Sequence, residues 1–428
     1  MPNRCRGYWL VVSMAALVLF GLPLSVVPRA NAAGNSNQFG GQDRAAAAAQ
    51  MIVLGVQQGI SSLPPTSGQS FAYQFDPASD TYVRSEQLGP TSFRSPQTVG
   101  PGKFSFRLAT SYFELADTKA PIPYLVSSPP GTALGVGALG LQADAKVALV
   151  NLSANYGFTN RVEVTMNLPV VVVDASAKQI FSTSQPTGPP QQAPFSGTPI
   201  VTDSTGKPDL AASVGLLNQA IQAGALHLRK ESLSALGFSF NDGTHVGVGR
   251  ISLGVKGVLY ADKIVQLAAA PEFYFPSPNQ GEFAGSDSAA ILPRLVAAFR
   301  LADAVRLHID AGYDYDFDKD ELRRFVWNLG PSLALGRATV DAGVGGSKFN
   351  TGIKWTPTTA PFVDNSGNPG SIRALGDNRL GSNFIDALGA VKVRLGTKSV
   401  LSGAVNVPLN NEGFRAAAVG TLAVELHL

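Results

Sequence analysis

The stretch VRLHIDAGYDYDFD, from Val305 to Asp318, decides the fold class. Its odd-numbered residues are all apolar, whereas its even-numbered residues are charged or polar apart from Gly312. Successive side chains point to opposite faces of a β-strand, so this stretch has one apolar and one charged face. Strands of this length cross a hydrocarbon layer at a tilt, with apolar side chains toward lipid and polar ones toward a lumen. The stretch therefore predicts a transmembrane β-strand.

The same alternation recurs from Lys103 to the C-terminus. Clear cases are Arg161–Leu168, Arg250–Leu259 and Phe325–Leu335, and further strands are expected at 103–115, 141–156, 264–276, 289–301, 338–349, 382–395, 399–409 and 414–428. Short connections (157–160, 261–263, 302–304, 336–337 and 396–398) alternate with longer ones, including 116–140, 175–244 and 350–381. Outer-membrane barrels have short periplasmic turns and longer outer loops. We therefore predict an all-β, antiparallel up-and-down transmembrane β-barrel of about 12 strands over residues 103–428, with a long loop at 175–244.

The N-terminus predicts export. Arg4 and Arg6 precede an apolar run, and small residues end at Ala32, so residues 1–32 have the pattern of a signal peptide cleaved after Ala32. An uncleaved membrane anchor is the alternative. Residues 33–102 are then a periplasmic N-terminal segment, and the expected location is the bacterial outer membrane. The C-terminal strand 414–428 resembles the signal read by the barrel assembly machinery, although it ends in Leu428 rather than phenylalanine.

Charge and cysteine content narrow the possible partners. The chain has 33 basic and 30 acidic residues, and removal of three signal-peptide arginines leaves equal numbers. Neither the balance nor any basic run predicts nucleic-acid binding. The one cysteine is Cys5, so a processed chain has no disulfide or thiolate metal site. Membrane lipid and a small solute are the expected partners, and no cofactor is predicted.

Several motifs resemble one family. They are FDP at 75–77, LGP at 88–90, TVGPGK at 98–103, YGFTNRVEV at 156–164 with Leu168-Pro169, and NVPLN at 406–410. Together they resemble the outer-membrane proteins grouped as the MetA-pathway of phenol degradation family, over residues 71–428. The resemblance implies a barrel connected with passage of aromatic or other hydrophobic compounds. The segment 175–244 looks longer than is typical of that family.

Two segments have helical rather than strand patterns. Apolar residues predict a helix at about 43–62, capped by Asp43 and stopped by Pro64 and Pro65, which either plugs the barrel or extends into the periplasm. Pro208-Asp209 begins a second helical pattern with Leu210, Val214, Leu217, Ile221 and Leu226 on one face. Because an apolar face outside the cell needs a cover, we expect this helix to fold back over the barrel mouth.

Catalytic and metal-binding motifs are weak. Asp314, Asp316 and Asp318 imitate the start of an EF-hand, but Lys319 replaces the required glycine and Phe325 the bidentate glutamate. A solvated lumen face is favoured over a bound divalent cation. No catalytic residues are predicted, and parity instead places a set of polar residues inside the barrel: Arg107, Arg161, Glu163, Arg250, Lys256, Glu272, Arg294, Arg306, His308, Asp310, Asp314, Asp316, Lys392 and Arg394.

These observations favour a non-enzymatic outer-membrane channel or transporter. A charged lumen of mixed sign implies little charge selectivity. Two alternatives stay open: a structural or surface-interaction barrel with a closed lumen, and, less favoured, an outer-membrane hydrolase, which would need a nucleophile, base and orienter converging near one rim.

Overall fold

Pairing of the last strand with the first one closes the sheet into a barrel. In the computed structural model, β21 (Val419–His427) runs antiparallel to β3 (Phe104–Ser127), with Gly420 opposite Tyr112 and His427 opposite Ser105. A closed sheet leaves no unpaired edge, which a lipid environment requires because it offers backbone groups no hydrogen bonds. The predicted closed antiparallel barrel of twelve strands is confirmed.

The structure describes residues 71–76, 81–127, 134–188, 196–232, 242–277, 286–350, 357–363, 369–375, 383–410 and 415–428, all within one compact unit spanning 39–428. Their remaining strands are β1 (Phe71–Asp76), β2 (Thr81–Leu88), β4 (Leu134–Gly157), β5 (Val162–Thr183), β6 (Thr198–Pro199), β7 (His227–Ser232), β8 (Gly243–Val248), β9 (Ser252–Ala261), β10 (Val265–Ala269), β11 (Glu272–Tyr274), β12 (Ala290–Leu292), β13 (Arg294–Arg300), β14 (Val305–Asp316), β15 (Arg324–Leu335), β16 (Ala338–Phe349), β17 (Pro357–Val363), β18 (Pro369–Leu375), β19 (Asn383–Arg394) and β20 (Ser399–Pro408). The helices are α3 (Leu210–Gln222) and the 3₁₀ turn η3 (Asp320–Leu322).

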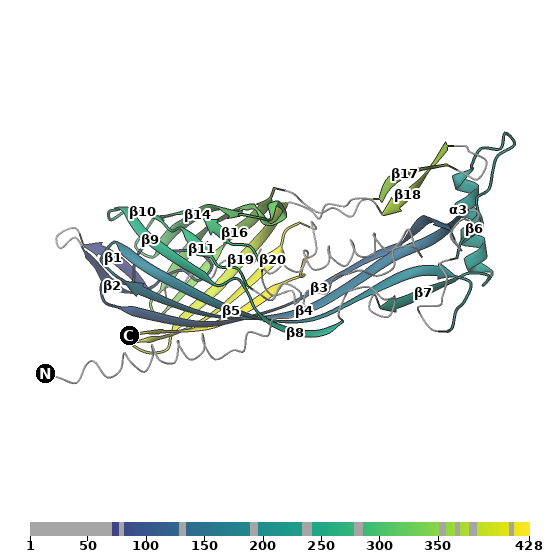
Figure 1. The fold of residues 1–428 in the computed structure, drawn as a ribbon. Helices are drawn as coiled ribbons and strands as arrows, with labels where there is room; N and C mark the ends of the chain where they lie inside the picture. Colours follow the sequence, from purple (N-terminus) through teal and green to yellow (C-terminus); the bar gives the residue numbers. More distant parts are fainter. Residues whose placement is uncertain are drawn as a thin grey trace. The chain divides into compact units, whose positions relative to one another are not determined.

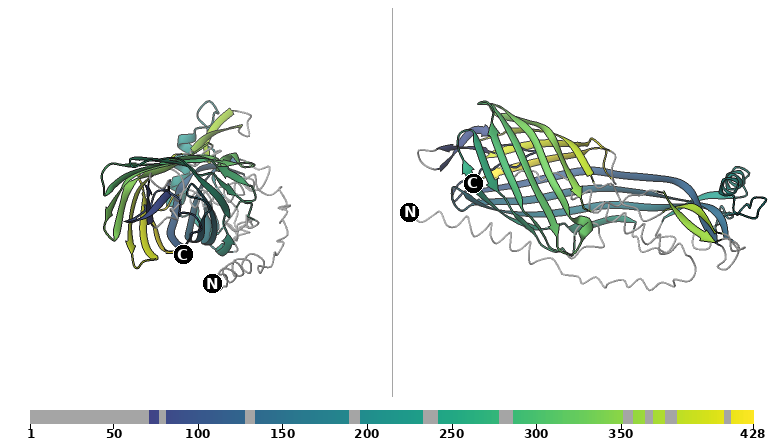
Figure 2. Two further views of the ribbon diagram at one scale, coloured as in Figure 1. Left: turned by 90° about the vertical axis from the view of Figure 1, so that its left-hand side faces the viewer. Right: turned by 90° about the horizontal axis from the view of Figure 1, so that it is seen from above.

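Three of the twelve strands are interrupted, and two of the breaks are at prolines. Pro271 separates β10 from β11, and Pro293 separates β12 from β13. Proline has no N–H to donate to the sheet, so regular pairing stops at these positions. Both carbonyls still accept hydrogen bonds, from Val255 at 3.0 Å and Tyr313 at 3.1 Å. The wall therefore continues past each break, and the tilted strands form one barrel (Figure 2).

Exposure alternates along the strands as the sequence predicts. On β13, Leu295 is 57% exposed, whereas its neighbours Arg294 and Val296 are 4% and 0% exposed. The outward face carries large apolar side chains around the barrel, among them Leu253, Leu259, Leu333, Val391 and Leu422. Such a surface is unstable in water and suited to hydrocarbon. The barrel is thus of the outer-membrane type.

The three strands β3, β4 and β5 are much longer than the sequence suggests. They contain 24, 24 and 22 residues and run on beyond the barrel wall toward α3 and β6 (Figure 1). The predicted loop at 116–140 is therefore wrong, since β3 and β4 stay paired as far as Ser127 and Leu134. The sequence-based prediction assigns each strand only the length needed to cross a bilayer. A hairpin that extends beyond the membrane can be longer.

Much of the described part of the predicted long loop at 175–244 is likewise regular structure. It contains the end of β5, then β6, α3 and β7, with β7 paired to residues 178–183 of β5. The helix begins as expected, with Asp209 accepting a hydrogen bond from the N–H of Ala212 at 2.9 Å. Its apolar face packs on Val136 and Ala138 of β4. The expectation that this helix covers the barrel mouth is therefore wrong.

The short turns lie at one end of the barrel, together with the C-terminus. They connect β4 to β5, β9 to β10, β13 to β14, β15 to β16 and β19 to β20. In the turn after β9, Asp262 accepts hydrogen bonds from the N–H groups of Val265 and Ile264 and from the Tyr260 hydroxyl, which hold the pKa of its carboxyl below the usual value. The last strand begins at Val419 rather than at the predicted residue 414. We take this end as periplasmic.

The N-terminal part is described from β1 onward. β1 and β2 pair with each other as a two-stranded sheet, and β2 contacts β15, β16 and β19. The predicted signal peptide at 1–32 and the predicted helix at 43–62 lie outside the described residues. Among the described residues, no helix is long and apolar enough to span a bilayer.

Changing a lipid-facing leucine to arginine tests the membrane assignment. Leu295 lies in the middle of the interrupted wall strand formed by β12 and β13, whereas Leu301, 63% exposed, lies in the periplasmic turn after it. Arginine at the bilayer midplane costs about 2–4 kcal/mol, falling to about 0–1 kcal/mol near the interface. We expect Leu295→Arg to lower the unfolding free energy by that larger amount and Leu301→Arg to have little effect, as measured by urea titration in lipid vesicles. Equal small effects at both positions would contradict a membrane-embedded wall.

Candidate functional site

The lumen is occupied by the chain segment that precedes the first barrel strand. We call residues 88–102 the lumenal segment. Leu88 is the last residue of β2, and Phe93 and Val99 lie in a stretch without regular structure, yet the three side chains are only 3%, 0% and 0% exposed. Thr339, near the periplasmic start of β16, donates a hydrogen bond to the carbonyl of Leu88 at 3.1 Å. The prediction that residues 33–102 are wholly periplasmic is therefore wrong for this segment.

One set of contacts anchors the lumenal segment to β16 and β19. The carboxylate of Asp341 accepts hydrogen bonds from the backbone N–H groups of Thr91, at 2.5 Å, and Ser92, at 3.1 Å. Lys392 donates to the carbonyl of Pro90 at 2.9 Å. Both wall side chains are almost fully buried, and hydrogen bonds to charged groups are about twice as strong as neutral ones. These contacts fix the start of the segment.

A second set anchors the segment to the wall formed by β5, β9 and β11. Arg94 forms an ion pair with Glu272. Lys256 donates to the carbonyl of Ser95 at 3.3 Å and pairs with Glu163 at 3.0 Å, and Glu163 also accepts from the N–H of Val99 at 2.7 Å. Two further hydrogen bonds join Gln97 to Gln266 and Thr98 to the carbonyl of Asn160. The segment thus spans the lumen from one wall to another.

The space left beside the segment is small and polar. A cavity of about 50 Å³ lies among Arg94, Glu272 and the inner side chains of β4 and β5, including Ser153, Asn155, Thr165 and Asn167. A single water molecule needs roughly 10–15 Å³ of such space. The cavity therefore has room for a few water molecules but not for an aromatic ring. This cavity is too small to hold an organic solute of that size.

A ladder of charged residues lines the wall beyond the segment. Arg294 pairs with Asp310, which also accepts from Asn328 at 3.1 Å. Buried opposite charges of this kind are stable only when paired and hydrogen bonded. The ladder thus pairs the opposite charges of this wall with one another.

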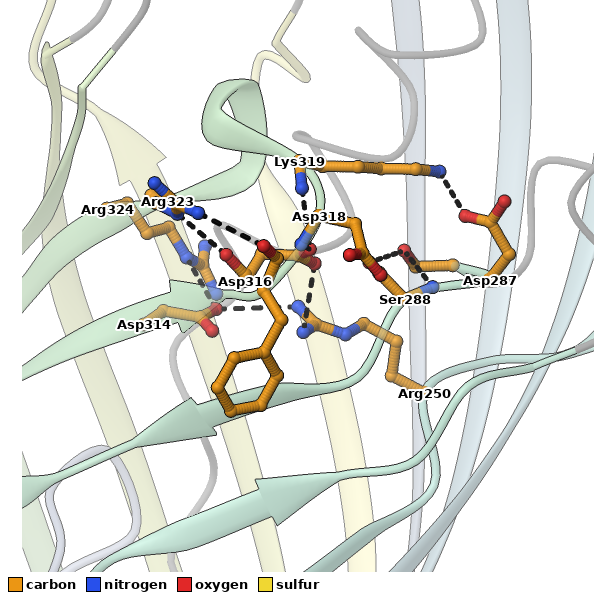
Figure 3. Close-up of polar contacts among 11 residues, drawn as sticks. Arg250, Asp287, Ser288, Asp314, Asp316, Asp318, Lys319, Arg323 and Arg324 are labelled. Atoms are coloured by element: carbon orange, nitrogen blue, oxygen red, sulfur yellow. Dashed lines mark hydrogen bonds and ion pairs between the residues drawn. The ribbon is translucent and has the colours of Figure 1, made fainter.

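The ladder ends in a cluster at the outer end of β14 (Figure 3). Arg250 lies 3.5 Å from both Asp314 and Asp316, and Arg324 lies 3.3 Å from Asp314. Asp316 also accepts a hydrogen bond from the N–H of Lys319 at 3.0 Å. The carboxylates face arginines, and the described residues contain no group of acidic, histidine or cysteine side chains suited to a metal. The cluster fixes the connection between β14 and β15.

The structure places most of the polar residues expected in the lumen on the inner face of the wall. Buried there are Arg107, Glu163, Glu272, Arg294, His308, Asp310, Asp314, Asp316 and Lys392, with Arg250 and Lys256 slightly more exposed. Arg306 and Arg394 are half-buried. Arg161 is exposed, because β5 begins only at Val162 and Arg161 belongs to the preceding turn.

Sequence reasoning missed the residues that matter most for closure. Asp341 shares the inward parity of Thr339 on a predicted strand, so the alternation was a sufficient signal for it. Arg94 and Phe93 lie in a segment without strand periodicity, and no local pattern places them in a lumen.

A family model of outer-membrane proteins matches part of the chain. The family model described as "Putative MetA-pathway of phenol degradation" matches residues 195–376, which agrees with the family that the motifs resemble. None of the curated proteins is significantly similar in sequence.

Several solved structures resemble this chain, with low TM-scores and low sequence identity. The COG4313 outer membrane channel from Pseudomonas putida F1 is 12% identical, with a TM-score of 0.42, and the match covers 80% of this chain and 100% of that one. The Pseudomonas putida toluene transporter TodX is 10% identical, with a TM-score of 0.34 and coverage of 86% and 96%.

Removing the Asp341 carboxylate tests whether the lumenal segment closes the barrel. Asp341→Ala deletes two charge-assisted hydrogen bonds, each contributing about 1.5–3 kcal/mol. Since about 1.4 kcal/mol corresponds to a tenfold change in an equilibrium, the open fraction should rise by at least about tenfold. Single-channel recording in planar bilayers would measure this as more frequent or larger openings.

Asp303→Ala is the matched control, because the Asp303 side chain is 96% exposed in a periplasmic turn. It should leave the current unchanged. If the two variants behave alike, the segment does not limit conductance.

Proposed function

We propose that this chain is an outer-membrane channel for the passive passage of small hydrophobic or aromatic solutes. The observation that carries the proposal is the occupied lumen. A barrel whose interior is filled by its own preceding segment, held by hydrogen bonds, ion pairs and the packing of Leu88 and Phe93, has a path that opens when the segment shifts. In a barrel filled instead by side chains of its own wall strands, no segment could move aside to open a path.

The solute class rests on the family. Its description refers to phenol degradation, a process that needs aromatic compounds to cross the outer membrane. The paired inner charges leave no large field of one sign, so the lumen has no evident means of selecting ions by charge.

A hydrolase is the less favoured function. Ser105, Glu425 and His427 lie together, but the serine hydroxyl donates to the carboxylate at 2.8 Å, and His427 contacts that same carboxylate oxygen at 2.9 Å. An acyl-transfer site needs the serine to bond to the imidazole and the imidazole to the carboxylate. The central group here is the carboxylate, so this order is not formed. The three residues instead link β3 to β21.

Uptake of an aromatic dye by whole cells tests the channel. The lipopolysaccharide leaflet slows entry of N-phenyl-1-naphthylamine, which fluoresces when it reaches an apolar environment. We expect cells of a Gram-negative host producing the chain to take up the dye several-fold faster than cells producing none. Deletion of residues 89–98, which keeps the turn before β3, should accelerate uptake further.

Sugar permeation provides the second readout. Liposomes containing the intact chain should swell slowly in a disaccharide, because the lumenal segment occupies the barrel interior. Fast swelling with the intact chain would identify a general porin instead. Dye uptake at the background rate, for both the intact and the deleted chain, would favour the structural barrel and overturn the proposal.

A further inference from the structure

The side chain of Phe93 fills a recess in the barrel wall. It is 0% exposed and lies against β14, β15 and β16, at a row formed by His308, Gly330 and Gly343. His308 is directly opposite Gly330 in the register of β14 and β15. Gly343 is the next inward position on the following strand. The recess therefore spans three adjacent strands.

The recess exists because two inward positions carry no side chain. A Cβ atom added to Gly330 would overlap the Cζ atom of Phe93, and one added to Gly343 would lie 2.7 Å from the same atom. The added atoms would also meet the carbonyl oxygens of Ala342 and Leu329, so the two strands approach closely and expose bare backbone. Neither glycine has a positive φ, so space rather than backbone conformation excludes a side chain.

His308 forms the remaining side of the recess. Its ring is parallel to that of Phe93, with an interplanar angle of 6° and a centroid distance of 5.8 Å, which is a stacked arrangement. His308 is 2% exposed, and neither ring nitrogen has a hydrogen-bond partner among the described residues. A buried polar group without a partner is costly and signals an unmet interaction. Phe93 supplies a ring for stacking but no hydrogen bond.

We propose that this recess is a binding site for an aromatic solute and that Phe93 occupies it as a tethered competitor. The site accepts a single six-membered ring, which lies over the two glycines beside the edge of the His308 ring. A hydroxyl on that ring donates to an imidazole nitrogen, an interaction that Phe93 cannot make. Binding of the solute excludes Phe93 and so favours release of the lumenal segment. This inference rests on the proposed channel function and adds to it a location and a means of opening.

The competition sets the concentration at which the solute acts. A ring tethered by a short chain has an effective concentration in the millimolar range or above. A free solute must match this through concentration or through its additional hydrogen bond. Opening should therefore respond to millimolar rather than trace amounts of a phenol.

Labelling of a cysteine beside Phe93 tests the competition directly. Ser92 is 4% exposed and its hydroxyl has no hydrogen-bond partner, so Ser92→Cys introduces a thiol with little disturbance. Cys5 is the chain's own cysteine and is replaced by serine. We expect millimolar phenol to raise the rate of maleimide labelling several-fold in the full chain, and cyclohexanol, which has the same hydroxyl without the aromatic ring, to leave it unchanged. No response to phenol, or equal responses to both, would overturn the proposal.

Two variants and one control distinguish binding of phenol in the recess from a general loosening of the lumenal segment. His308→Phe keeps the stacking ring and removes both nitrogens, so the response to phenol should fall. Phe93→Ala empties the recess, and phenol should then raise the unfolding temperature as a ligand of the folded state does. Val99→Ala, which truncates another fully buried residue of the segment, should gain no such stabilisation from phenol. Equal stabilisation of both alanine variants would overturn the proposal.

Dye uptake by cells distinguishes failure of the channel function from failure of the aromatic site in the recess. If the intact chain speeds dye uptake but phenol does not affect labelling, the channel function is supported and the recess holds only Phe93. If uptake stays at background while phenol promotes labelling, the recess binds aromatic rings but the channel function fails.

Discussion

The structure depends on the antiparallel pairing of β21 with β3. Without it the sheet has two open edges, and lipid offers no hydrogen bonds to satisfy them. With it, every strand has two neighbours and each residue faces either lipid or the lumen. The inward placement of charged residues, such as Asp310 and Arg294, follows from closure because the outward face must be apolar. Closure also creates an interior that the chain must fill.

The interior is filled in two different ways. Around β14, wall residues pair with one another, as Arg294 does with Asp310. Elsewhere in the lumen, the walls pair with the lumenal segment instead, through Asp341, Lys392 and Glu272. A polar wall is thus compatible both with a closed lumen and with a solvated one. The same residues that hold the segment face water once it has left.

The sequence predicts the wall far better than it predicts the lumen's contents. Alternation is a property of each strand by itself, so stretches such as 305–318 reveal their inner and outer faces without any knowledge of neighbours. The position of Phe93 depends instead on two glycines more than 200 residues away, which become a recess only after β14, β15 and β16 pair. The ends of β3–β5 were missed for a related reason, since strands outside the membrane lack the alternation that lipid imposes.

When the lumenal segment leaves, some of the wall residues that bound it keep another partner and one does not. Lys256 and Glu163 still pair with each other, and Glu272 still accepts a hydrogen bond from the Tyr274 hydroxyl at 2.8 Å. Asp341 differs, because one of its carboxylate oxygens bonds only to the segment and the other has no partner among the described residues. It is 2% exposed, and a buried carboxylate without partners is strongly unfavourable. Opening therefore leaves the Asp341 carboxylate to water and to the nearby Lys392 ammonium, so its solvation contributes to the free-energy difference between the closed and open lumen.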